Sequence, residues 1–95
     1  MSTTIMQWNA NGLRAHQGEL KNFIFKNGAP SIICIQETFL KPKHNFTFPG
    51  YSTARKDRLT DNKGGLIILI KDTISFETLV SQDDAEHLSI KINLD

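Results

Sequence analysis

The sequence predicts an α/β fold in which a βαβ unit is followed by an antiparallel meander. Three observations predict it. A strand pattern, a helix pattern and a second strand pattern follow one another between residues 3 and 35. The second strand pattern is a continuous apolar run, which is typical of a parallel strand covered on both faces. Residues 86–94 alternate between apolar and polar side chains, which is typical of a strand with one face on a core.

The first strand is expected over residues 3–8, because Thr, Ile and Trp favour extended backbone. The sequence Asn11-Gly12 that follows is a strong turn signal. A helix is expected to begin near Gln17, and its apolar stripe consists of Leu20, Phe23 and Ile24. Gly28 and Pro30 are typical residues just beyond the end of a helix.

The second strand is expected at residues 31–35, within the run IICI. A strand, a helix and a strand of these lengths form a βαβ unit, so we expect parallel strands with a right-handed crossover. A loop at 40–50 contains two prolines, and strands are then expected at 51–54, 66–70, 75–80 and 86–94. Gly64 and Gly65 indicate a bend or bulge before the 66–70 strand. The well-patterned last strand favours a sheet that continues beyond residue 95.

The composition is that of an ordinary globular chain, with 95 residues, 39% hydrophobic and 22% charged. The net charge of +1 neither requires nor excludes a nucleic-acid partner. The single cysteine, Cys34, excludes an internal disulfide framework and fits a reducing compartment. The apolar runs are too short to cross a bilayer, and the first eight residues do not resemble a signal peptide. A nuclear or cytoplasmic location, without a membrane partner, is therefore expected.

The candidate chemistry lies at the ends of the first two strands, where Asn9 and Glu37 follow the apolar patterns. Parallel neighbours lie about 4.8 Å apart and end at the same edge, so the two side chains are expected to share a crevice. A carboxylate there can hold Mg²⁺, and an amide beside it can orient a phosphate. A second interpretation is structural: Asn9 belongs to a turn, and Glu37 is a solvated strand exit.

A resemblance favours the first interpretation. The segments WNANGLR (8–14) and IQET (35–38) resemble the opening of the endonuclease/exonuclease/phosphatase family. They are most similar to the endonuclease of non-LTR, jockey-like and long interspersed retrotransposons, as are residues 55–58 and 63–68. The resemblance covers nearly the whole chain. It implies a two-sheet α/β sandwich, of which residues 1–95 would be the N-terminal part.

The resemblance also implies roles. Glu37 matches the family's metal-binding glutamate, for Mg²⁺ or Mn²⁺, and Asn9 matches the asparagine beside it in the active site. Asn11 falls where AP endonucleases carry an aspartate near the metal, and the amide is expected to face nucleic acid instead. Arg14 falls where some relatives touch the DNA backbone. The implied partners are DNA and the remainder of a polyprotein with a reverse transcriptase.

The family's later motifs, Asp-x-Asn and Asp-His, do not occur in the sequence. The chain is therefore expected to be truncated before them, as an inactive fragment of an enzyme that nicks DNA for target-primed reverse transcription. Two alternatives stay open: a phosphatase of the same family that acts on a small or lipid phosphate, and a degenerate remnant without catalysis. The basic run Arg55, Lys56 and Arg58 has two interpretations, a phosphate contact and a solvated hairpin loop.

Overall fold

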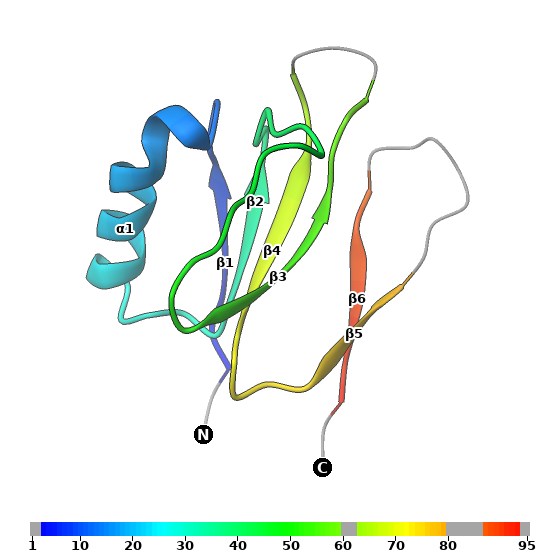
Figure 1. The fold of residues 1–95 in the computed structure, drawn as a ribbon. Helices are drawn as coiled ribbons and strands as arrows, with labels where there is room; N and C mark the ends of the chain where they lie inside the picture. The colour runs from blue at the N-terminus through cyan, green and yellow to red at the C-terminus, as the bar shows by residue number, and fades with distance from the viewer. Residues whose placement is uncertain (1–2, 60–62, 80–86, 94–95) are drawn as a thin grey trace.

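The computed structural model describes residues 3–59, 63–79 and 87–93 (Figure 1). The first sheet has four strands in the order β1-β2-β4-β3, and the second has two, β5 and β6. In chain order the elements are β1 (Ile5–Asn9), the 3₁₀ turn η1 (Arg14–His16), α1 (Gln17–Lys26), β2 (Ile32–Gln36), β3 (Tyr51–Lys56), β4 (Leu66–Lys71), β5 (Phe76–Leu79) and β6 (Ser89–Ile92). None of the described helices is long and apolar enough to cross a membrane.

The βαβ unit forms as predicted. Strands β1 and β2 are parallel, with a register that runs from Ile5 opposite Ile32 to Asn9 opposite Gln36. Helix α1 begins at the predicted Gln17 and buries Leu20 and Ile24 from the predicted stripe. The pairing brings the C-terminal ends of both strands to one edge of the sheet, at the upper end in Figure 1.

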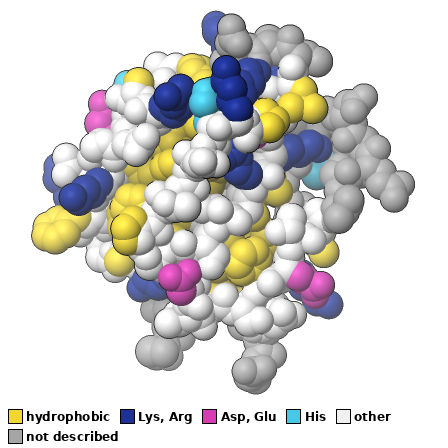
Figure 2. Space-filling view, in the orientation of Figure 1, with side chains coloured by type: hydrophobic (Ala, Val, Ile, Leu, Met, Phe, Trp, Pro, Cys, Tyr) yellow, Lys and Arg dark blue, Asp and Glu magenta, His cyan; other side chains and the backbone are white. Residues whose placement is uncertain are grey.

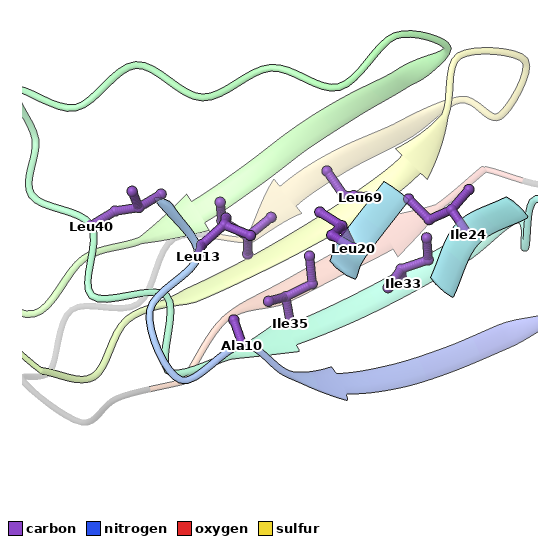
Figure 3. Packing of buried hydrophobic residues seen from close by; sticks show 9 residues of the cluster. Ala10, Leu13, Leu20, Ile24, Ile33, Ile35, Leu40 and Leu69 are labelled. Atoms are coloured by element: carbon purple, nitrogen blue, oxygen red, sulfur yellow. The ribbon is translucent and has the colours of Figure 1, made fainter. Parts of the chain in front are cut away.

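The four-stranded sheet lies between two layers and has a core on each face. On one face, side chains from β2 and β4 pack against α1 (Figure 3), and the buried members of this core are Ala10, Leu13, Leu20, Ile24, Ile33, Ile35, Leu40, Ile67 and Leu69. On the opposite face, Ile32, Ile68 and Ile70 pack against apolar side chains of β5 and β6. The predicted burial of the second strand on both faces is confirmed, because Ile32 and Ile33 face opposite layers and are at most 3% exposed.

The second half is antiparallel as predicted, but it divides between two sheets. Strand β4 pairs with both β2 and β3, whereas β5 pairs with β6. The side chains explain the division. Strand β4 is apolar on both faces, which suits the interior of a covered sheet, whereas β5 partly buries only Phe76 and β6 partly buries Ile90 and Ile92. Two predicted strands extend beyond the described part of the chain. These are the 75–80 strand at residue 80 and the 86–94 strand at residues 86 and 94.

Candidate active site

The edge where β1 and β2 end, which we call the carboxyl edge, carries both predicted catalytic residues. Asn9 is the last residue of β1, and Glu37 is the first residue after β2. The loop after β1 runs alongside the loop after β2: the backbone N–H of Ala10 donates to the carbonyl of Gln36 at 2.9 Å, and that of Gly12 to the carbonyl of Glu37 at 2.9 Å. The parallel pairing thus brings the amide and the carboxyl residue side by side, and both are exposed.

The Asn9 side chain takes part in a turn. Its Oδ1 accepts a hydrogen bond from the backbone N–H of Asn11 at 3.1 Å, the arrangement of an Asx turn. The turn interpretation is therefore correct in part. Oδ1 thus has one of its two lone pairs engaged, and the NH₂ group of Asn9 is the donor that a ligand could contact. That group suits a phosphate oxygen better than it suits a metal ion.

The Glu37 carboxylate is exposed and has no hydrogen bond or ion pair within residues 3–59, 63–79 and 87–93. An unengaged carboxylate fits Mg²⁺ or Mn²⁺, because Mg²⁺ keeps several waters and takes one or two protein carboxylates. Among the described residues there is no cluster of three or more His, Cys, Asp and Glu side chains that would hold a metal by itself. Glu37 would therefore be one protein ligand in a largely hydrated site.

Left-handed backbone is concentrated at this edge. Glu37 has φ 52°, and the same sign occurs at Asn11, Gly12, Phe39, Gly64 and Gly65. Non-glycine residues in this region cost about 1–3 kcal/mol each and persist where the surroundings fix them, often at functional sites. This observation does not depend on the family resemblance, and it shows that the loops around Glu37 hold a costly backbone conformation.

Hydrogen bonds from two sides fix the segment that contains Glu37. On one side, the N–H groups of Gly12 and Leu13 donate to the carbonyls of Glu37 and Thr38, both at 2.9 Å. On the other side, Thr38 and Phe39 donate to the carbonyls of Gly65 and Gly64, at 3.3 and 2.8 Å. The backbone of residues 37–39 is thus held between the loop after β1 and the glycine pair before β4.

The glycine pair is needed for close approach as well as for the bend that the sequence predicts. Gly65 has φ +92°, and a Cβ at this position would overlap Oγ1 of Thr38. Thr38 is fully buried, and its Oγ1 accepts from the N–H of Leu40 at 3.3 Å. Sequence analysis did not identify Thr38 and Gly65 as residues that position Glu37; the signal in the sequence was the doublet Gly64-Gly65 before an apolar strand.

Arg55 differs from both predicted interpretations of the basic run, because its guanidinium is occupied inside the molecule. Nε and NH2 donate to the two carboxylate oxygens of Asp57 at 3.1 and 2.7 Å. NH1 donates to the carbonyl of His44 at 2.7 Å, and NH2 also donates to that of Lys41 at 2.9 Å. Arg55 therefore ties the loop after β2 to β3, and neither a phosphate contact nor a solvated loop describes it.

The predicted nucleic-acid residues lie in the same loop as Asn9. Asn11 and Arg14 are both exposed, and Arg14 begins η1. Figure 2 shows Lys and Arg side chains gathered around a histidine at the upper end of the molecule, where β1 and β2 end. The carboxyl edge thus carries the Glu37 carboxylate, the Asn9 amide and basic side chains. In open α/β sheets, ligands bind outside the carboxyl ends of the strands, which is where this edge lies.

Comparison with known proteins identifies the family to which the chain belongs. The family model described as the endonuclease/exonuclease/phosphatase family matches residues 6–94, and the chain belongs to this family. A 3′-5′ exonuclease, NExo from Neisseria meningitidis, superposes with a TM-score of 0.67 at 18% identity, over 95% of this chain. A structure of the 3′ phosphatase NExo from Neisseria bound to a product DNA hairpin gives a TM-score of 0.64 at 21% identity, over 98%.

The chain spans 38% of the length of each of these two structures. A search of curated proteins finds no match. The likeness confirms the predicted fold, a fragment of a two-sheet α/β architecture. Members of this family and both structural neighbours are hydrolytic nucleases or phosphatases by description.

Proposed function

We propose that this chain is the N-terminal part of a Mg²⁺- or Mn²⁺-dependent endonuclease that nicks DNA for target-primed reverse transcription by a non-LTR retrotransposon. The main support is that Asn9 and Glu37 end adjacent parallel strands at one edge. The segments WNANGLR and IQET support the retrotransposon subgroup. The remainder of the polyprotein, with its reverse transcriptase, would follow residue 95, and the complete protein would act in the nucleus or the cytoplasm.

In this proposal Glu37 holds the metal ion through its unengaged carboxylate. When bound, the ion supplies polarisation of a phosphoryl oxygen and stabilisation of the leaving group. The NH₂ group of Asn9, oriented by the bond between Oδ1 and Asn11, donates to an oxygen of the scissile phosphate. Asn11 and Arg14 contact the DNA backbone, because both are exposed in the segment that follows Asn9.

Residues 1–95 alone are expected not to cleave DNA. The sequence contains no Asp-x-Asn or Asp-His motif, and in the family that it resembles the Asp-His pair supports the attack on phosphorus. General acid–base catalysis typically contributes about 10²–10⁴-fold. A supercoiled plasmid incubated with the chain and Mg²⁺ should stay intact. Robust nicking that Glu37→Ala abolishes would contradict this expectation, whereas nicking that survives Glu37→Ala would indicate a contaminant.

A second candidate is a phosphatase of the same family that acts on a small or lipid phosphate. The observation that favours phosphatase chemistry is the neighbour described as a 3′ phosphatase bound to a product DNA hairpin, a description that names DNA and not a small or lipid phosphate. A chain extended through the next in-frame sequence separates the candidates. Release of phosphate from a 3′-phosphorylated oligonucleotide or from an inositol phosphate favours the phosphatase, and internal nicking favours the endonuclease.

A third candidate is a degenerate remnant without catalysis, which the missing motifs favour. An early stop codon downstream would support it.

A further inference from the structure

His44 lies near the carboxyl edge in a position that the proposed active site does not use. It closes a turn in which its own N–H donates to the carbonyl of Lys41 at 2.8 Å. The carbonyls of Lys41 and His44 both accept from the guanidinium of Arg55. The backbone N–H of Lys41 points back to Nδ1 of the His44 ring at 3.0 Å. The imidazole is therefore held by the turn and by Arg55 rather than free to rotate.

Both ring nitrogens face a donor, and we assign the tautomer from the backbone contact, because the Lys41 amide is fixed by the turn whereas the Arg14 side chain can rotate. A backbone N–H can only donate, so Nδ1 of His44 must accept, and the neutral ring then carries its hydrogen on Nε2. Desolvation of the ring, together with the positive charges of Arg14, Lys43 and Arg55, lowers the pKa of His44, while the charge of Asp57 acts in the opposite direction. The neutral form with a hydrogen on Nε2 therefore prevails at neutral pH.

The Nε2 group faces another donor. It lies 3.1 Å from NH1 of Arg14, and a guanidinium has no acceptor. Two N–H donors therefore converge with no acceptor between them, in an exposed position. Lys43 adds positive charge nearby, whereas Asp57 is already paired with Arg55 at 2.7 Å. A tetrahedral oxyanion that accepts from both donors would resolve this conflict.

We propose that Arg14 and His44 form a phosphate-binding site, in which the guanidinium and the Nε2–H of the imidazole donate to oxygens of one phosphate group. The site is separate from Glu37 and needs no metal ion. Its assignment to a phosphate of the nucleic-acid backbone rests on the proposed function. Because the imidazole is fixed by Lys41, it acts as a neutral, oriented donor, and it positions the phosphate more narrowly than a flexible lysine would.

Nuclear magnetic resonance tests the proposal on the ¹⁵N-labelled chain of residues 1–95. Long-range ¹H–¹⁵N spectra should show the His44 ring protonated on Nε2. Inorganic phosphate added at constant ionic strength should cause saturable shifts of His44 Nε2 and Arg14 Nε. Loss of one charge-assisted or oriented donor should weaken phosphate binding about tenfold in Arg14→Gln and in His44→Phe. Lys26→Gln, which removes a charge at the far end of α1, should leave the affinity unchanged.

The proposal is overturned if the His44 ring carries its proton on Nδ1, or if Lys26→Gln weakens phosphate binding as much as Arg14→Gln does. A short DNA duplex provides the second arm. Phosphate binding without DNA binding would support the phosphate-binding site and count against its role in binding nucleic acid. DNA binding that leaves the signals of Arg14 and His44 unshifted would overturn the site, and with it the DNA contact proposed for Arg14, but would leave the roles proposed for Glu37 and Asn9 standing. Circular dichroism of each variant verifies that the fold is retained.

Discussion

Gly65→Ala is expected to lower the free energy of unfolding by about 2–5 kcal/mol. Left-handed backbone costs a residue with a Cβ about 1–2 kcal/mol, and Gly65 has φ +92°. Overpacking of a filled site adds about 1–3 kcal/mol, because the new methyl group would overlap Oγ1 of Thr38. Thr38 is fully buried and cannot turn aside freely. Urea denaturation followed by circular dichroism measures the loss.

Gly50→Ala is the matched control for this substitution. Gly50 has φ +86°, nearly the value of Gly65, but nothing lies within 4 Å of a Cβ built there. Its cost should be the backbone strain alone, about 1–2 kcal/mol. If both variants lose the same stability, the close approach of Gly65 to Thr38 contributes nothing to the stability of the fold.

Arg55→Met is expected to destabilise the fold by about 3 kcal/mol, the lower end of the loss when one partner of a buried ion pair is removed, because this pair is part-buried. The Asp57 side chain is 8% exposed and would be left without its cation. The carbonyls of Lys41 and His44 would also lose their donors. The unfolding midpoint in urea should fall with an unchanged slope.

Two variants define the cause of this loss. Lys91→Met removes the cation of an exposed pair, where Lys91 and Glu77 lie 4.0 Å apart with side chains 65% and 60% exposed, and should cost at most about 1 kcal/mol. Asp57→Leu combined with Arg55→Met removes the uncompensated charge and should recover part of the stability. Equal losses of stability in Arg55→Met and Lys91→Met would mean that the Arg55 guanidinium does not hold the loop after β2.

The features predicted correctly are those that nearby residues determine. The bounds of α1 follow from a stripe of three apolar residues and a Gly-Ala-Pro sequence after it, and the parallel pairing of β1 with β2 follows from the short βαβ spacing. The positions of Asn9 and Glu37 follow from that pairing, since Asn9 is the last residue of β1 and Glu37 is the first residue after β2.

The features that sequence analysis missed depend on contacts between distant residues. The insertion of β4 between β2 and β3 is set by which strands bury both faces, and a continuous meander has the same local pattern. The donors of Arg55 reach carbonyls 11 and 14 residues away. The left-handed conformations of Glu37 and Phe39 are unusual for their residue types, and the loops on both sides impose them.

The most direct measurement of the central claim is paramagnetic broadening of the ¹⁵N-labelled chain by Mn²⁺. If Glu37 binds a divalent ion beside Asn9, the amide signals of residues 9–12 and 36–39 should broaden first. Glu37→Gln should abolish this broadening, and Glu19→Gln on α1 should preserve it. Broadening centred elsewhere, or broadening that is the same in Glu37→Gln, would contradict a shared amide and carboxylate pocket at the ends of the parallel strands.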